Sequence, residues 1–241
     1  MVKLLASQGH VVSVVGRRPP LERDRQIPRV RYWAVDLLNE EAINTALGEI
    51  LKTNGKLNNL VLCQRYRGQD DDWQGNLETT LSVTRKIIEQ LVNSFAAGSG
   101  NSIVAIGSIA GHYIAGEQSV GYHAAKAGLV QMVRYYAVVL GRKGIRVNCV
   151  SPGSIVREES RSFYAEHPEI IDLHRRITPL ARMGTAREVA GVVDFLCSAS
   201  ASFVTGQDIT VDGGVSLQGH EALVRDLTSR PHHGRTEKHQ K

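Results

Sequence analysis

The chain is organised around one stretch, Ser108-Ile-Ala-Gly-His-Tyr-Ile-Ala-Gly-Glu-Gln-Ser-Val-Gly-Tyr122-His-Ala-Ala-Lys126. The segment before it, Asn101-Ser-Ile-Val-Ala-Ile-Gly107, is a short apolar run that predicts a buried strand. The segment after it, residues 124–140, has the composition and the apolar spacing of a helix. Strands that alternate with helices favour an α/β fold.

Three polar side chains of this stretch predict proton-transfer chemistry. Tyr122 and Lys126 stand four residues apart, so on a helix they share one face, one turn from each other. A phenol ordinarily titrates near a pH of about 10, too high to exchange protons at neutral pH. We expect the Lys126 ammonium to favour the phenolate form of Tyr122, and we expect Ser108 to orient the same substrate oxygen.

Four further motifs follow in the second half of the chain. They are Asn148-Cys-Val-Ser-Pro-Gly153, Ile177-Thr-Pro-Leu-Ala-Arg-Met-Gly-Thr-Ala-Arg-Glu-Val-Ala190, Phe195-Leu-Cys-Ser198 and Val204-Thr-Gly-Gln-Asp-Ile-Thr-Val-Asp-Gly-Gly214. A bare Tyr-x-x-x-Lys spacing is common on exposed helices, but its combination with these motifs in this order is specific. Over residues 1–216 the chain resembles the short-chain dehydrogenase/reductase family, whose catalytic core is a Ser and a Tyr-x-x-x-Lys.

The resemblance implies a fold and a reaction. The fold would be one α/β domain over residues 1–219, a doubly wound, Rossmann-like, mostly parallel sheet with helices on both faces. The reaction would be hydride transfer between NADP(H) and a carbonyl or alcohol. In this reaction Tyr122 would act as the acid in reduction and as the base in oxidation. Lys126 would lower the pKa of Tyr122 and bind the nicotinamide ribose, and Ser108 would polarise the substrate oxygen. Thr80 stands where the family has a catalytic asparagine that holds a water of the proton relay.

Further positions are expected to contact the cofactor. Arg17 and Arg18 close the strand predicted over residues 10–15, where arginine suits a 2′-phosphate, so we expect NADP rather than NAD; a solvated loop is the alternative. Asp36, followed by Leu37, resembles the family's adenine-contacting aspartate, although an Asp at a strand end is otherwise an ordinary helix cap. The resemblance assigns the nicotinamide-contacting turn to Pro152, Gly153 and Ile155.

Several departures from the family pattern concern the cofactor. In the family a strand and a glycine-rich turn, T-G-x-x-x-G-I-G, precede the helix predicted at residues 1–8, and this chain begins at about the second turn of that helix. The true start lies upstream, or the protein is a degenerate form that needs no dinucleotide, or a rearrangement rebuilds the phosphate site. Bulky residues 62–65 replace an N-N-A-G segment, and Arg157 replaces a threonine that touches the cofactor. The alternative function is therefore a cofactor-poor, catalytically degenerate member that acts as a binding or assembly subunit.

Composition limits the remaining possibilities. The 241 residues carry a net charge of +5, and residues 1–35 alone, with seven basic and two acidic side chains, have a balance of +5. No basic face is spread over the fold, which argues against a nucleic-acid partner. No apolar run reaches transmembrane length and no signal peptide is recognised, so we expect no membrane contact. The three scattered cysteines predict reduced thiols in a cytoplasmic protein without a cysteine metal site.

The C-terminal residues and two of the predicted helices give expectations about disorder and oligomerisation. Residues 220–241 are polar, hold four of the nine histidines, and read as a short helix followed by a disordered tail. We expect no metal site there at His232, His233 and His239. Members of the family commonly form homodimers or homotetramers through helices that correspond to residues 73–97 and 123–141. The substrate, a small carbonyl or alcohol, and the reaction direction are not predicted.

Overall fold

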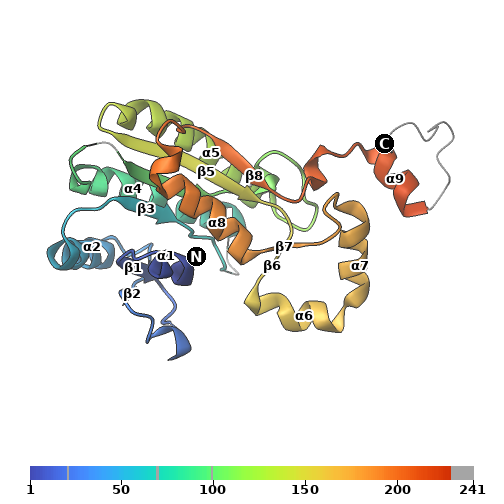
Figure 1. Cartoon of the computed structure of the whole chain (residues 1–241), viewed down its shortest axis with the longest axis horizontal. Coiled ribbons are helices and arrows are strands. Elements are labelled where there is room, and N and C mark those ends of the chain that lie inside the picture. The colour runs from blue at the N-terminus through green and yellow to red at the C-terminus, as the bar shows by residue number, and fades with distance from the viewer. Residues whose placement is uncertain (21, 69–70, 99, 229–241) are drawn as a thin grey trace.

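A computed structural model describes residues 1–20, 22–68, 71–98 and 100–228. The chain forms an α/β fold in which helices cover both faces of a parallel sheet (Figure 1). This confirms the predicted Rossmann-like class. In spatial order the strands of the main sheet are β3 (Asn59–Leu62), β4 (Asn101–Ile106), β5 (Ile145–Pro152) and β8 (Asp208–Val211).

The centre of the main sheet is buried on both faces. Strands β4 and β5 pair in parallel from Asn101↔Ile145 to Ile106↔Val150, and nearly every residue of the two strands is buried. Parallel strands covered on both sides are expected to be continuous apolar runs rather than alternating ones. The run at residues 101–106 therefore identified its strand correctly.

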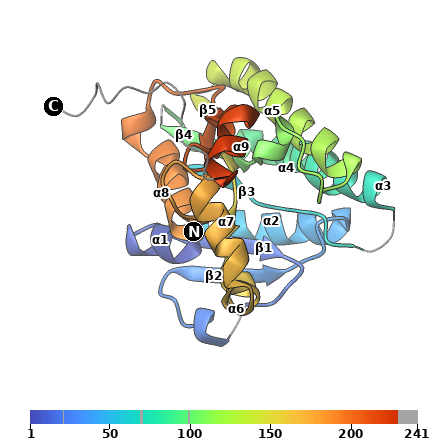
Figure 2. The same ribbon diagram turned by 90° about the vertical axis from the view of Figure 1, so that its right-hand side faces the viewer.

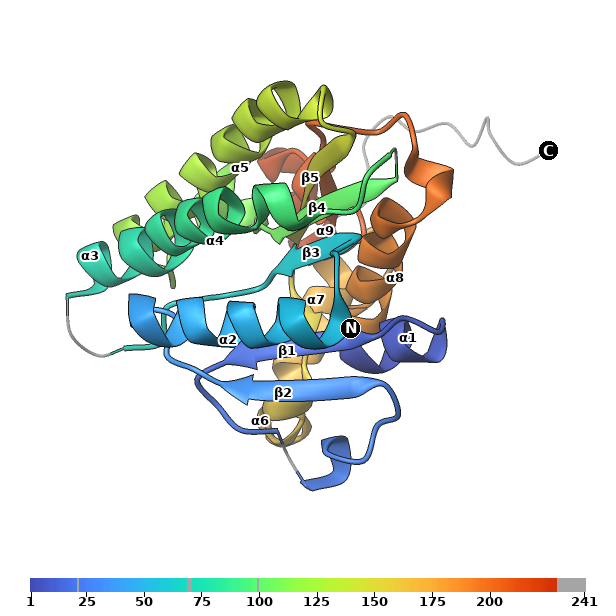
Figure 3. The same ribbon diagram turned by 90° about the vertical axis from the view of Figure 1, so that its left-hand side faces the viewer.

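Helices on the two faces of the sheet build two hydrophobic cores. One core packs Ile103 and Val147 against one layer of helices, and the other packs Val104 and Val150 against α8. Figure 3 shows α4 and α5 on one side of the sheet and α8 with α1 on the other. The helices of the first layer are α2 (Glu40–Asn54), α4 (Val83–Leu91) and α5 (Val120–Gly141); those of the second are α1 (Val2–Ser7) and α8 (Ala186–Cys197).

The long helix predicted over residues 73–97 is interrupted. It consists of α3 (Asp72–Leu77), a π-helical turn (Glu78–Ser82), α4, and a 3₁₀ turn (Val92–Ser94). The π-helical turn packs against α5, and Leu81 lies over Gly128 of that helix. An inserted π turn is frequent near functional sites, and here it holds Thr80.

Strands β1 (Val12–Gly16) and β2 (Val30–Ala34) form a separate parallel pair. Among the described residues no strand pairs with the other edge of β1 or with the other edge of β3. Figure 3 shows β1 and β3 running side by side with α2 packed across them. Within the described ranges β1 and β3 therefore do not pair with each other, and each keeps one open edge.

The last part of the fold lies beyond the carboxyl ends of the main strands. Figures 1 and 2 show α6 (Arg161–Glu166) and α7 (Pro168–Ile177) there, with α9 (His220–Thr228) against α7. A short connecting pair of strands, β6 (Ile155–Val156) and β7 (Gly184–Thr185), leads into α8. Within the described ranges no helix is long and apolar enough to cross a membrane. The division at residue 219 stays a prediction, and His232, His233 and His239 lie outside the described residues.

Candidate active site

Ser108 lies just past the carboxyl end of β4. It caps the 3₁₀ helix Ile109–Gly111, and its hydroxyl oxygen accepts a hydrogen bond of 3.2 Å from the Ala110 amide. This short helix packs directly on α5, because a Cβ atom added to Gly111 would lie 3.1 Å from the backbone carbonyl carbon of Lys126. Glycine therefore eases the close approach, and the contact brings the Ser108 turn next to the Lys126 turn.

Tyr122 and Lys126 occupy the first turns of α5, as the spacing predicts. Ser119 caps the helix by accepting from the Tyr122 amide at 3.2 Å. The Lys126 ammonium lies 5.8 Å from the centre of the Tyr122 ring. The two side chains therefore meet across one turn.

Lys126 is a buried cation, only 4% exposed. Its Nζ donates a 2.7 Å hydrogen bond to the Ile106 carbonyl, which ties α5 to the end of β4. Burial lowers the pKa of the ammonium to about 8, and the nearby Arg65 charge acts in the same direction. At neutral pH most molecules still carry the charge, which is held beside the Tyr122 ring.

The remaining predicted catalytic residue, Thr80, is 2% exposed within the π-helical turn. That turn packs on α5, so Thr80 belongs to the same region of the fold as Lys126. Its part in a water relay stays a prediction.

The predicted adenosine contacts lie at the carboxyl ends of β1 and β2. Arg17 and Arg18 follow β1 directly and are exposed. Asp36 is exposed after β2, and its carboxylate accepts from the Leu38 amide at 3.0 Å, while Leu37 packs on the core. Asp36 thus closes its own turn instead of capping α2, a function that Asn39 performs.

The predicted nicotinamide turn follows β5, whose last residue is Pro152. The Gly153 amide donates to the Val211 carbonyl at 3.1 Å, and an added Cβ atom would lie 2.6 Å from the Cβ of Asp212. Only glycine fits so close to a neighbouring chain segment. Ile155 pairs with Gly184 in the short β6–β7 ladder and packs on the α8 core.

Sequence reasoning missed Arg65 as a functional candidate and treated residues 62–65 only as bulk. The Arg65 guanidinium carbon lies 5.0 Å above the centre of the Tyr122 ring, and its Nη2 donates to Gln118 at 3.0 Å. The neighbouring Gln64 donates to Thr84 at 2.6 Å. Its place in the sequence could have identified Arg65, since it follows β3, and parallel sheets bind ligands at the carboxyl ends of their strands.

Two histidines, also missed, hold the segment between Ser108 and Tyr122. His123 Nε2 accepts from the Ala115 amide at 2.9 Å, so the imidazole is neutral and its Nδ1 donates to the Ser119 carbonyl at 2.7 Å. His112 Nε2 lies 2.6 Å from Asp208, a carboxylate that also accepts from Ser151 at 2.6 Å.

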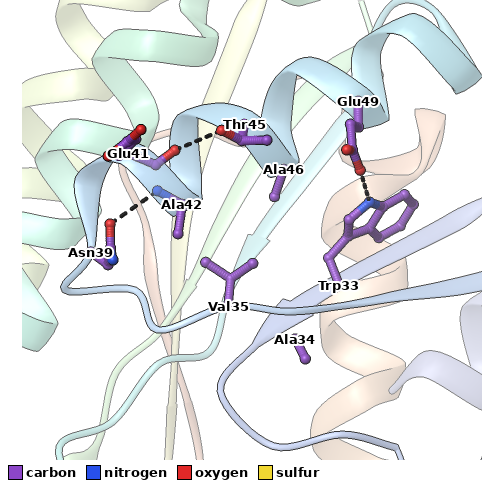
Figure 4. A pocket seen from close by; sticks show the side chains of 9 residues that line it. All are labelled: Trp33, Ala34, Val35, Asn39, Glu41, Ala42, Thr45, Ala46 and Glu49. Atoms are coloured by element: carbon purple, nitrogen blue, oxygen red, sulfur yellow. Dashed lines mark hydrogen bonds between the residues drawn. The ribbon is translucent and has the colours of Figure 1, made fainter.

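A surface pocket of about 380 Å³ lies elsewhere, between β2 and α2 (Figure 4). Trp33 and Val35 line it, and the Trp33 indole donates to Glu49 at 3.2 Å. Two carboxylates, Glu41 and Glu49, belong to its wall and disfavour phosphate groups. None of the predicted catalytic residues lines this pocket, so it is not part of the candidate active site around Tyr122.

Comparisons with known proteins identify the family of the chain. Residues 1–216 match a family model described as enoyl-(acyl carrier protein) reductase. An uncharacterised oxidoreductase of Schizosaccharomyces pombe is 34% identical over 208 residues, 80% of this chain and 77% of that protein. A 3-oxoacyl-[acyl-carrier-protein] reductase of Buchnera aphidicola is 33% identical over 213 residues, 87% and 78% of the two chains.

Solved structures share the fold. An NADPH-bound short-chain oxidoreductase of Pseudomonas aeruginosa, which has an atypical catalytic center, superposes with a TM-score of 0.79 at 24% identity. The superposition covers 90% of this chain and 91% of that one. At this level of identity the likeness concerns the fold alone.

Proposed function

Because this chain belongs to the short-chain dehydrogenase/reductase family of NAD(P)-dependent oxidoreductases, we propose that it interconverts a carbonyl and an alcohol with NADP(H). In this proposal Ser108, Tyr122 and Lys126 form the proton-transfer site. The substrate is a small molecule bound at the carboxyl edge of the main sheet.

One observation carries the proposal: an ammonium is held buried one turn from a phenol. Lys126 has a carbonyl rather than a carboxylate as its hydrogen-bond partner, and keeping an ion there costs stability. A charge so placed is explained if it stabilises the phenolate that remains when Tyr122 gives up its proton. A merely structural role would be served as well by an apolar side chain.

Each side chain then has a definite task. The Tyr122 hydroxyl donates a proton to the substrate oxygen during reduction and takes it back during oxidation. The Ser108 oxygen accepts from an amide, so its own hydroxyl hydrogen is free to donate to the same substrate oxygen. We assign Thr80 to the water relay that returns a proton toward Lys126.

The residues present fit an anionic dinucleotide, whose nicotinamide would supply or accept the hydride when bound. Cationic groups suit phosphates, and Arg17 and Arg18 are exposed at the end of β1. We therefore assign the 2′-phosphate of NADP to the arginine pair, and Asp36 is the proposed adenine contact. Leu37, Pro152, Gly153 and Ile155 are the proposed apolar and backbone contacts.

A second candidate function, a binding or assembly subunit without turnover, is favoured by two observations. The edges of β1 and β3 are unpaired among the described residues, and Arg65 lies over the Tyr122 ring. In either case we propose a homodimer or homotetramer, because α5 exposes the apolar side chains of Tyr135, Val138 and Val139.

Thermal unfolding in the presence of cofactor separates the two functions. NADPH at about 100 times its Kd should stabilise the fold by about 2.7 kcal/mol. For a chain of this size that corresponds to a rise in Tm of roughly 5–10 °C, with a smaller rise for NADH at equal concentration. Tyr122→Phe should abolish turnover and leave the Tm unchanged. If millimolar NADPH and NADH both leave the Tm unchanged, the enzyme proposal is wrong for this chain.

A further inference from the structure

Arg65 is a cation without a carboxylate partner at the catalytic tyrosine. Its neighbour in the same loop, Arg67, is paired with Glu159 at 3.4 Å. For Arg65 no acidic residue among those the structure describes lies at ion-pair distance.

Neutral groups hold the Arg65 side chain in place. Its Nη2 donates to the amide oxygen of Gln118, and the guanidinium carbon stands 5.0 Å from the Tyr122 ring centre. Gln118 belongs to the segment that His123 holds through the Ala115 amide. These contacts orient the guanidinium but leave its charge unbalanced.

A second unbalanced cation, Lys126, lies on the same side of the fold. Its Nζ is 5.8 Å from the Tyr122 ring centre, and its hydrogen-bond partner is the Ile106 carbonyl. Two like charges beside one phenol favour the binding of an anion there. The lowered pKa of Lys126, to which the Arg65 charge contributes, agrees with this placement.

The carboxylate of Asp72 lies near Gly121, the residue before Tyr122, and accepts from the Asn76 side-chain amide at 2.9 Å. Two further carboxylates, on β8 and in the turn after it, are also engaged. Asp208 accepts from Ser151 and contacts His112. The Asp212 carboxylate accepts from the amides of Gly214 and Ser216 at 2.9 Å each. Neither carboxylate is therefore free to compensate the two cations.

We propose that the Arg65 guanidinium binds an anionic group, a carboxylate or a phosphate, of the molecule bound against Tyr122. The planar fork of an arginine matches both anions through two parallel hydrogen bonds. The inference rests on the proposed function and names its ligand chemistry. The anion has two possible sources, the substrate and a phosphate of the dinucleotide, which share this chemistry.

The first test needs no turnover. Inorganic pyrophosphate is titrated by calorimetry into wild type, Arg65→Met and Arg67→Met at constant ionic strength set with NaCl. Both variants lose one exposed positive charge from the same loop, but only Arg67 is neutralised by a carboxylate. We expect Arg65→Met to weaken pyrophosphate binding at least fivefold, and Arg67→Met to change it less than twofold. Arg65→Lys, which keeps the charge and loses the fork, should fall between them.

Two further measurements identify the source of the anion. If a cofactor phosphate is recognised, Arg65→Met raises the Kd for NADPH about tenfold and leaves the ratio of kcat/KM between a 2-oxo acid and its methyl ester unchanged. If the substrate is recognised, that ratio falls about tenfold and the Kd for NADPH is unchanged.

The outcomes separate the inference from the proposed function. Arg65→Met and Arg67→Met behaving alike in the pyrophosphate titration, with circular dichroism showing both folded, would overturn the inference. A wild type that turns over no carbonyl would overturn the proposed function, and the pyrophosphate titration would still decide the role of Arg65.

Discussion

Replacing Lys126 by methionine tests the buried cation directly. Lys126→Met keeps the length of the side chain and removes its charge. The fall of the lysine pKa from 10.5 to about 8 means that folding disfavours the charged form by about 3 kcal/mol, at about 1.4 kcal/mol per pKa unit. Against this, the variant leaves the Ile106 carbonyl without its donor, which costs about 1–3 kcal/mol. At pH 7 we expect the variant to be as stable as the wild type, or more stable by up to about 2 kcal/mol.

The difference in stability between wild type and Lys126→Met should also depend on pH. Between pH 8 and 10.5 the unfolded chain keeps a proton on Lys126 that the folded chain has released. The unfolded state then binds more protons, so the stability contributed by this group rises with pH. From pH 7 to 9.5 the wild type should gain about 2 kcal/mol relative to Lys126→Met. The thiols of Cys149 and Cys197, whose pKa burial raises to about 12 and about 11, stay protonated in the folded state over this range.

Urea unfolding followed by far-ultraviolet circular dichroism at several pH values measures both quantities. Lys86→Met is the matched control, because Lys86 is solvent-exposed and ion-paired with Glu40 at 3.3 Å. That variant should show no such trend with pH. If the difference between wild type and Lys126→Met stays constant within about 0.5 kcal/mol, the lowered pKa is wrong, and with it the main support for the proton-transfer site.

Substitutions at three further positions test individual contacts by the same urea assay. Asp208→Ala removes a carboxylate, 6% exposed in its side chain, from the buried Ser151 hydroxyl, and should cost about 1.5–3 kcal/mol; Asp208→Asn, which keeps an acceptor, should cost less. Gly153→Ala forces a Cβ atom to 2.6 Å from that of Asp212, so a loss of about 1–3 kcal/mol is expected, and an unchanged midpoint would contradict that contact. The Arg182 and Thr185 contacts lower the pKa of the exposed Glu188 to about 2, so its contribution is present above pH 4.5 and lost as the pH falls toward 2. Because solvent screens this pair, Glu188→Gln should cost less than about 1 kcal/mol at pH 7 and nothing at pH 2.

The sequence predicted best those elements whose residues carry their own signal. The apolar run at 101–106 forms a buried strand, as predicted. The sequence of α2 likewise carries its own signals, because Asn39 caps the helix and Ile43, Leu47 and Ile50 are buried at helical spacing. Tyr122 and Lys126 are related by a single helical turn, so their meeting follows from local geometry alone.

Features that depend on contacts between distant segments were not predictable in this way. The π-helical turn at Thr80 has no sequence signature and lies where the chain packs on α5. Arg65 and Tyr122 are far apart in the chain, and only the fold places one over the other. For Asp36 the sequence offered two roles, an adenine contact or a helix cap. The structure gives the cap of α2 to Asn39, and the adenine contact stays a prediction.

The separation of β1 from β3 has a consequence for the backbone itself. In a parallel strand alternate residues point their amide and carbonyl to opposite sides, so a strand with one neighbour uses only every second pair. Strands β4 and β5 have neighbours on both sides, whereas β1 and β3 have a described partner on one side only. The open edges of β1 and β3 therefore each present a row of peptide donors and acceptors without a described strand partner, and a further extended backbone could pair with such an edge.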